Sequence, residues 1–481
     1  MRKVALCALG LLPVAFGCTA LLGNFDVASG PGTDAGGDGA DDGALADGNA
    51  DGSTDGADDA PDAANTVFTT CGISAPRVVA QYAPDAGGFD FGPVVVFRTA
   101  MNQVRVVTQR NLMDGATVYS FDPNKNGQNG PITPDIADLQ ASGRYLDARN
   151  LPVQGNLSLL FMERQPGTMV QMKVMELQHT NPTQANPVYV SNPFADTQSG
   201  GGGGNIEGVL GAYQNNNEYF WAVGGWPSSA PGPQSYDLIV GHRVNAANKP
   251  NPVVVHTTQD QKLTRIREMA RSKTTQFIFN DKGPEGDAND PGTAYFAVPQ
   301  DTTTAVPPKN MKPAGSANPY VLIGASGVST GDGIRVAVAE VDFNNPGSFG
   351  VVKAGLVSQA DLDKGFDGSN VPNAFTITTL TEVPAEGAAR FFGDDLLWLG
   401  SPPDPLRGKG LNFMWFNTQT RAMRAKFAGA NRLLIDHMDI KRVSIALVQQ
   451  TAVNADLDVV LIEKLPNENT ALTYATMSCI R

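Results

Sequence analysis

The chain of 481 residues has few of the features on which functional assignments usually rest. It contains four cysteines and four histidines, and the sequence patterns of zinc proteases, phosphate-binding loops and serine hydrolases do not occur in it. No apolar run beyond Leu12 is long enough to cross a bilayer, which takes about 20 residues. Basic residues are too few to form a positive face, since the formal net charge is −13. Nucleic acid is therefore not an expected partner.

The negative charge is concentrated in one segment. Residues 26–62 contain eleven Asp and no Lys, Arg or Glu, so the chain from Asn65 onward is close to balanced. Residues 27–64 are rich in Gly, Ala and Asp and contain no aromatic residue. Such a segment cannot bury enough apolar surface to offset its chain entropy. The composition predicts a disordered acidic linker over residues 27–64, followed by a folded domain over residues 65–481.

The first eighteen residues have the layout of an export signal. Arg2 and Lys3 provide a positive start, the run from Val4 to Leu12 is apolar, and Ala15-Phe16-Gly17-Cys18 follows. In these residues the chain resembles bacterial lipoproteins. The resemblance implies that residues 1–17 are a signal peptide and that Cys18 is acylated, with residues 18–26 as the lipidated N-terminus. The alternative is an ordinary secretory signal cut after Gly17, since a small-x-small site is also present.

The resemblance also predicts a location. Thr19 stands where the lipoprotein family's inner-membrane retention signal is Asp, which favours the outer membrane. We therefore expect a protein held at the outer membrane by its N-terminal lipid, facing the periplasm or the cell exterior.

Two cysteines remain for the folded domain once Cys7, in the signal, and Cys18 are set aside. Cys71 and Cys479 lie near its two ends. In an exported protein such a pair is expected to form a disulfide, which would tie the first element of the domain to the last. Two separate thiols, or thiols paired with another chain, are the alternative.

The folded domain reads as all-β. Short runs of β-branched and aromatic residues alternate with Gly, Pro and Asn, and convincing amphipathic helix patterns are almost absent. The runs fall into seven pairs, at residues 94–97 with 104–107, 157–162 with 169–177, 219–223 with 236–240, 277–279 with 294–297, 321–323 with 334–341, 396–399 with 411–416, and 443–448 with 457–462.

The regular recurrence of these pairs favours a β-propeller of six to eight blades, seven being preferred, because a ring of sheets leaves only short edges. The resemblance to propellers is architectural and covers Cys71 to Cys479, and the repeated Trp-Asp signature is missing. Two or three consecutive β-sandwich domains are the alternative.

Calcium is the one cofactor that the sequence suggests. Asp122, Asn124 and Asn126 place oxygen-bearing side chains at alternate positions before Gly127, as at the start of a calcium loop. The twelfth position is Thr133 instead of Glu, and a tight Asn-Gly turn explains the pattern equally well.

Aromatic and acidic residues supply the remaining candidates for a site. Trp221, Trp226 and Trp398 could present flat faces to a sugar, and packing between blades is the alternative role for them. No catalytic residue is assigned. The acidic candidates for an enzyme are Glu207, Asp237 and Asp436.

The function predicted from these features is that of a monomeric, lipid-anchored, extracytoplasmic module that binds or scaffolds a protein or glycan partner. The alternative is a carbohydrate-active or other hydrolase or lyase on the same scaffold. A glycosidase would bring two acidic groups to within about 5 to 9.5 Å in one cleft. A purely structural envelope protein, without a sizeable pocket, is a third interpretation.

Overall fold

The computed structural model describes thirty β-strands. The residues that it describes are 70–82, 93–99, 102–109, 115–125, 132–139, 143–150, 157–166, 169–177, 185–195, 206–211, 219–227, 235–243, 251–259, 266–272, 275–280, 294–299, 309–310, 320–327, 333–341, 349–358, 360–361, 386–392, 395–401, 410–417, 422–423, 433–436, 439–451, 453–465, 467 and 469–480. Within these ranges, no helix is long and apolar enough to span a membrane. The described strands form seven antiparallel sheets, which we call blades 1 to 7.

The first three blades follow one another along the chain. Blade 1 contains β3 (Val95–Arg98), β4 (Val104–Thr108), β5 (Thr117–Phe121) and β6 (Asp135–Asp138). Blade 2 contains β7 (Arg144–Asn150), β8 (Leu157–Gln165), β9 (Met169–Leu177), β10 (Ala185–Val190) and β11 (Phe194–Ala195). Blade 3 contains β12 (Glu207–Gly211), β13 (Tyr219–Pro227), β14 (Tyr236–Arg243) and β15 (Val253–Thr258).

The next three blades repeat this plan. Blade 4 contains β16 (Ile266–Arg271), β17 (Thr275–Asn280), β18 (Ala294–Pro299) and β19 (Lys309–Asn310). Blade 5 contains β20 (Tyr320–Gly327), β21 (Gly333–Val341) and β22 (Phe349–Ser358). Blade 6 contains β23 (Glu386–Phe392), β24 (Asp395–Ser401), β25 (Gly410–Asn417), β26 (Ala422–Met423) and β27 (Leu433–Asp436).

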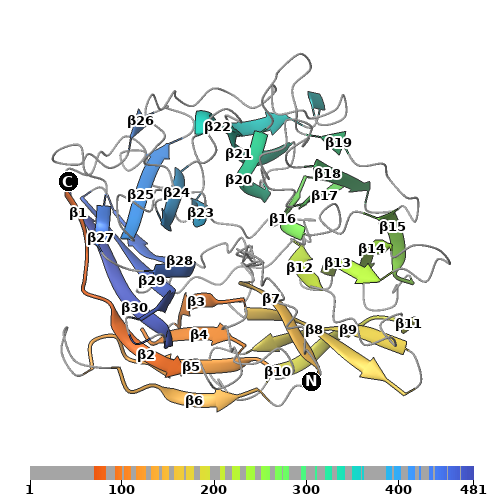
Figure 1. The fold of residues 1–481 in the computed structure, drawn as a ribbon, viewed down its shortest axis with the longest axis horizontal. Helices are drawn as coiled ribbons and strands as arrows, with labels where there is room; N and C mark the ends of the chain where they lie inside the picture. Colours follow the sequence, from red (N-terminus) through yellow and green to blue (C-terminus); the bar gives the residue numbers. More distant parts are fainter. Residues whose placement is uncertain are drawn as a thin grey trace, which may run out of the picture.

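Blade 7 is built from both ends of the domain. It contains β28 (Asp439–Gln450), β29 (Asn454–Lys464) and β30 (Thr470–Ile480), together with β1 (Thr70–Ile73) and β2 (Arg77–Tyr82). Both N-terminal strands pair with β30, and Figure 1 shows the C-terminus beside β1. The first strands of the domain therefore complete its last sheet.

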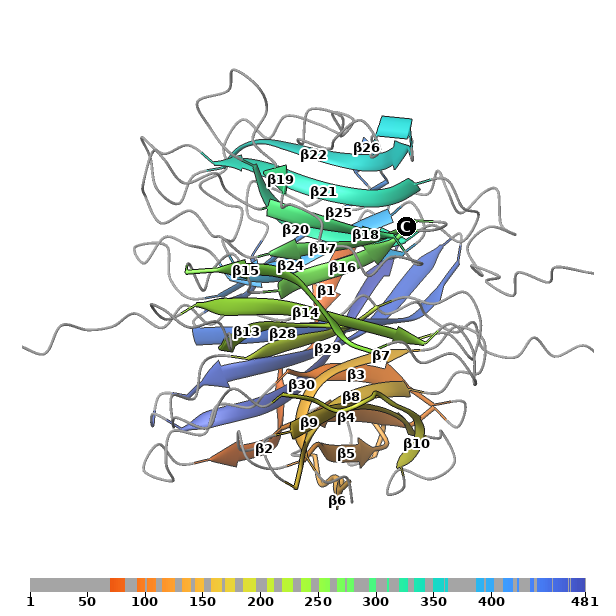
Figure 2. The same ribbon diagram turned by 90° about the vertical axis from the view of Figure 1, so that its right-hand side faces the viewer.

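The blades are arranged in a ring (Figure 1). The innermost strand of each blade contacts that of the next, from β7 through β12, β16, β20 and β23 to β28, and β28 contacts β3. A shared cluster of buried residues joins blade 1 to blade 2. Seen from the side, blades 3, 4 and 5 follow one another from the middle of the molecule to its top (Figure 2). The β-propeller predicted from the sequence is confirmed, and each of the seven predicted strand pairs lies in a different blade.

Each blade is packed on both faces, which explains why the strands are so rich in β-branched and aromatic residues. Successive side chains of a strand point to opposite faces of its sheet. In β4, Val104 and Val106 join the cluster shared with blade 7, whereas Val107 joins the cluster shared with blade 2. All five residues of β4 are consequently buried.

The innermost strands are sheet edges, so their outward amide groups need partners from elsewhere. Side chains of the neighbouring blade supply such partners, as two examples show. The Leu210 amide in β12 donates to Asp147 Oδ2 of blade 2 (2.8 Å). The Val96 amide in β3 donates to Ser444 Oγ of blade 7 (3.2 Å). These bonds fix the position of each of these strands relative to the adjacent blade.

The ring is closed by a covalent bond as well as by strand pairing. Cys71 and Cys479 lie directly opposite each other in β1 and β30, with Cα atoms 4.1 Å apart, and form a disulfide that spans 408 residues. This agrees with the pairing expected from the sequence. We call the contact between blade 7 and blade 1 the closure interface.

Candidate functional site

The closure interface changes character along its length. Strand alternation turns Val460 and Ile462 of β29, and Leu472 of β30, toward blade 1, where they are buried with Val94, Val96 and other apolar residues. Closer to the turn between β28 and β29, the face of these two strands that is turned toward blade 1 carries polar residues instead. They are Asp456 and Asp458 on β29 and Tyr474, Thr476 and Ser478 on β30. One end of the interface is thus a dry core and the other is polar.

A buried ion pair marks the boundary between these two ends. Arg98, the last residue of β3, donates from Nε to Asp458 Oδ2 (2.9 Å) and from Nη2 to Asp458 Oδ1 (2.5 Å). The Asp458 carboxylate is fully buried, whereas the Arg98 side chain is 17% exposed. Bidentate bonds of this kind are among the stronger side-chain interactions, and they fix the relative orientation of both partners.

Tyr474 completes the network. Its hydroxyl donates to Asp458 Oδ1 (2.6 Å) and accepts a longer bond from Arg98 Nη2 (3.3 Å). Burial raises the pKa of Tyr474 far above its ordinary value, and the negative charge of Asp458 raises it further. Burial opposes the charge of Arg98, but the hydrogen bonds and charge of Asp458 outweigh it, so the pKa of Arg98 lies above its ordinary value. The network therefore holds a charged Arg98 and a neutral Tyr474.

Two further contacts hold the loops around this network. Arg98 Nη1 donates to Asn102 Oδ1 (2.6 Å), and Asn102 has a backbone φ of 61°, a conformation that Asn tolerates better than most residues. Arg77 of β2 is buried and donates to the carbonyl oxygens of Pro123 (2.9 Å) and Lys125 (3.3 Å). The turn after β5 is thereby fastened to blade 7.

A cleft of about 670 Å³ lies over these groups. It is bounded by strand ends and turns of blades 7 and 1, and we call it the closure cleft. The residues that line it are Gly72, Ile73, Ser74, Arg77, Arg98, Asn102, Pro123, Asn124, Val448, Gln449, Asp456, Leu457, Tyr474, Thr476, Ser478 and Ile480. Its volume falls within the ~300–1,000 Å³ typical of small-molecule sites.

Asp456 is the carboxylate that lines the cleft. Its Oδ1 accepts from Ser478 Oγ (2.6 Å) and its Oδ2 accepts from Gln449 Nε2 (2.5 Å). Asp458, two residues further along the same face, does not line the cleft and is held by Arg98 and Tyr474. The cleft therefore combines one accessible carboxylate, two guanidinium groups that are hydrogen-bonded within the protein, and neutral hydrogen-bonding groups, an arrangement that can orient a ligand.

The calcium candidates are accounted for by a turn as far as the structure describes them. Asp122 Oδ1 accepts from the Asn124 amide (2.9 Å), and the Asp122 carbonyl accepts from the Lys125 amide (3.2 Å). Asn126 lies outside the described residues. Among the residues with described positions, no group of three His, Cys, Asp or Glu side chains could hold a metal ion.

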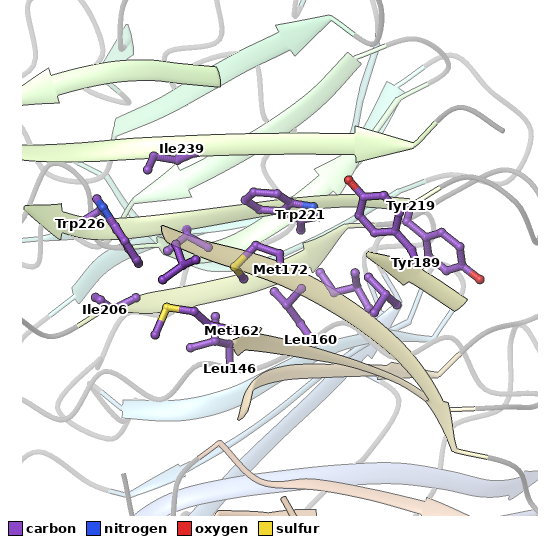
Figure 3. Packing of buried hydrophobic residues seen from close by; sticks show 14 residues of the cluster. Leu146, Leu160, Met162, Met172, Tyr189, Ile206, Tyr219, Trp221, Trp226 and Ile239 are labelled. Atoms are coloured by element: carbon purple, nitrogen blue, oxygen red, sulfur yellow. The ribbon is translucent and has the colours of Figure 1, made fainter. Parts of the chain in front are cut away.

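The tryptophans suggested as a sugar platform are part of the core where their side chains are described. Trp221 and Trp226 are 0% and 1% exposed and pack between blades 2 and 3, with Met172 and Ile239 around them (Figure 3). Gly241 lies against the Trp221 ring, and a Cβ there would come within 2.3 Å of Trp221 Cζ2. These surroundings match the alternative role given above for Trp221 and Trp226, which is packing between blades. Trp398 lies in β24 of blade 6.

The structure places the acidic candidates for an enzyme on three different strands. Glu207 and Asp237 lie in blade 3 on β12 and β14, with β13 between them, and Asp436 lies in blade 6. Asp237 is buried and accepts from Thr257 Oγ1 (2.6 Å). Burial lowers the pKa of the Arg144 guanidinium in blade 2, and the negative charge of Glu207 opposes this shift only in part. Cys18 lies outside the described residues.

Sequence reasoning missed the residues of the closure cleft. Arg98 lies more than 350 residues before Asp456 and Asp458 in the chain, and only the ring brings it close to them. One feature of the sequence could have indicated the buried ion pair. A charged residue inside a strand of otherwise buried apolar residues, such as Asp458 between Leu457 and Val459, usually has a charged partner.

Comparison with known proteins adds no assignment beyond the fold. The sequence matches no protein-family model and no curated protein. Among solved structures, the WD40 domain of Toxoplasma gondii coronin matches with a TM-score of 0.45 and 9% identity, over 86% of this chain and 88% of that chain.

Two further solved structures match more loosely. A subtype N11 neuraminidase-like protein of A/flat-faced bat/Peru/033/2010 (H18N11) matches with a TM-score of 0.36 and 10% identity, over 86% of this chain and 96% of that chain. A thermostable family-43 glycoside hydrolase matches with a TM-score of 0.28 and 9% identity, over 61% of this chain and 91% of that chain. None of these matches carries a functional argument.

Proposed function

We propose that this protein is a lipid-anchored binding module of the bacterial outer membrane that receives its ligand in the closure cleft. The single observation that supports the binding role is the cleft itself. Its cationic groups are engaged within the protein, Arg98 by Asp458 and Arg77 by two carbonyl oxygens. Hydrogen-bonding side chains remain at its surface, as in sites that orient a ligand without transforming it.

The anchoring part of the proposal is supported by the lipoprotein-like signal ending at Cys18 and by the acidic composition of residues 27–64. Several acyl chains would hold the protein to the membrane permanently, because each buried methylene contributes about 0.8 kcal/mol. The hydrolase alternative lacks a comparable observation, because the acidic residues suggested for it lie on separate strands of blades 3 and 6.

Anchoring is tested by separating the cell envelope into membrane and soluble fractions. The unaltered protein is expected in the outer-membrane fraction, with an intact mass that includes the acyl chains. Cys18→Ala is expected to remove both the added mass and the membrane retention. Recovery of Cys18→Ala in the membrane fraction at the level of the unaltered protein would contradict the anchor.

The site of binding is tested by filling the cleft. Ser478 is exposed on β30 and lines the cleft, so Ser478→Trp should occlude it. Ser358, an exposed serine at the end of β22 in blade 5, provides the matched control Ser358→Trp. In assays against purified envelope polysaccharide and outer-membrane protein, Ser358→Trp should bind as the unaltered protein does and Ser478→Trp should not. Equal binding by both variants would place the ligand elsewhere.

A further inference from the structure

The polar residues of the closure cleft also indicate which class of ligand it takes, and this inference rests on the proposed binding function. We infer that the cleft recognises an uncharged, hydroxyl-rich ligand, a carbohydrate, and that Asp456 is the residue that anchors it.

The first step concerns charge. An anionic ligand would need an available cation, but Arg98 already binds Asp458 with two hydrogen bonds and Arg77 is buried against the carbonyls of Pro123 and Lys125. Drawing either guanidinium away would leave buried acceptors without their donors, which is unfavourable. The cleft is thus poorly suited to phosphate or carboxylate groups.

The second step concerns Asp456. Ser478 and Gln449 each donate one hydrogen bond to it, one to each carboxylate oxygen. Each oxygen of a carboxylate has two acceptor positions, so this arrangement fixes the group and leaves one position on each oxygen. Two acceptors side by side on one rigid group match two adjacent hydroxyl groups of a sugar.

The third step concerns the surroundings of Asp456. Asn102 and Asn124 are exposed at the cleft, and Thr476 lies beside Ser478 on the same face of β30. Amide and hydroxyl side chains both donate and accept, as sugar hydroxyls do. Ile480, on that face of β30, is 58% exposed and offers an apolar surface to the C–H groups of a sugar ring.

The fourth step separates a sugar from an extended peptide. A peptide that binds by strand addition needs a free sheet edge. The cleft lies over the face of β29 and β30, and each of these strands already has partners on both sides. Strand addition to β29 or β30 is therefore excluded. β1 is an edge of the described sheet of blade 7 and also lines the cleft, so the peptide probes below test strand addition there.

The test compares three sets of probes on the full-length, membrane-extracted protein. The probes are neutral oligosaccharides of two to four sugars, oligosaccharides containing uronic acids, and a library of unmodified peptides. Asp456→Asn is the test variant. The matched control is Asp361→Asn, because Asp361, which follows β22 of blade 5, likewise accepts a hydrogen bond from a serine hydroxyl, that of Ser358 (2.8 Å). Melting temperatures establish that both variants are folded.

We expect at least one neutral oligosaccharide to bind, Asp456→Asn to weaken it by about tenfold or more, and Asp361→Asn to leave it unchanged. Binding of peptides or uronic oligosaccharides alone would overturn the ligand class and leave the binding module standing. Saccharide binding that Asp456→Asn does not weaken would overturn the role of Asp456. If no probe class binds, both the ligand class and the binding function proposed for the cleft are wrong.

Discussion

Two interfaces between blades show how differently this ring is held together. Between blades 2 and 3, four large aromatic residues (Tyr189, Tyr219, Trp221 and Trp226) and several aliphatic and Met side chains form one buried cluster (Figure 3). The closure interface has an apolar core too, but it adds the Arg98–Asp458–Tyr474 network and an open cleft, and blade 7 itself is cross-linked by the disulfide.

The difference follows from the path of the chain. Blades 2 and 3 are consecutive in sequence, so one connection already holds them close and apolar packing is sufficient. Blade 7 is assembled from strands at opposite ends of the domain, and closing so long a loop costs chain entropy. The hydrogen-bonded ion pair and the disulfide offset this loss of chain entropy. They also keep polar groups at one end of the interface, where the cleft forms.

Removing the disulfide should have the largest effect on stability. Cys71→Ala with Cys479→Ala is expected to lower the free energy of unfolding by about 5 kcal/mol, the upper end of measured values, because the closed loop is so long. Denaturation in urea with and without reductant measures it. The unaltered protein in reductant should behave as the double variant does, and an unchanged urea midpoint would show that the two ends need no covalent link.

Breaking the buried ion pair should come next. Asp458→Ala leaves the Arg98 guanidinium without its carboxylate and is expected to cost about 3–5 kcal/mol. The double variant Arg98→Met with Asp458→Leu should recover much of that loss, because apolar residues of similar size often replace a buried pair with little penalty. If the double variant is no more stable than Asp458→Ala, apolar residues cannot replace the ion pair at this interface, and the expectation of recovery is wrong.

A pair of glycine substitutions compares the packed interface with the cleft directly. Gly241→Ala forces a Cβ to within 2.3 Å of the Trp221 ring and should cost about 1–3 kcal/mol, with a change in tryptophan near-ultraviolet circular dichroism. Gly72 lines the closure cleft, and a Cβ there would meet no atom within 4 Å. Gly72→Ala should therefore change stability by less than about 0.5 kcal/mol. If the two substitutions change stability equally, the packed interface and the closure cleft do not differ as proposed.

The smallest effect is expected from alkaline pH. Burial, and then Asp458, raise the pKa of Tyr474 above its ordinary value of 10.0, so folding favours the neutral phenol. Its contribution to stability is complete below pH 10 and is lost as the pH rises above that value, by about 1 kcal/mol between about pH 7 and about pH 10.5. Tyr474→Phe should reduce this loss, measured as the difference between urea midpoints at the two pH values. If Tyr474→Phe loses the same stability between the two pH values, Tyr474 is not the source of the loss.

Local sequence patterns were enough to predict the ring but not the cleft. Alternating residues such as Val104 to Val107 mark strands wherever they occur, and a pair of ends bearing Cys71 and Cys479 indicates closure. The cleft depends on which strand faces which, and the partner of Asp458 lies 360 residues away. The aromatic residues misdirected the search for a site, because Trp221 is as suited to filling an interface as to stacking on a sugar.

Disulfide mapping of the protein extracted from the cell envelope tests most directly whether the two ends of the domain close the ring. Free thiols are blocked, the unreduced protein is digested, and the linked peptides are identified by mass spectrometry. The ring described above predicts a single linked pair, with Cys71 in one peptide and Cys479 in the other. Recovery of both residues as blocked free thiols, or of either one joined to another chain, would contradict it.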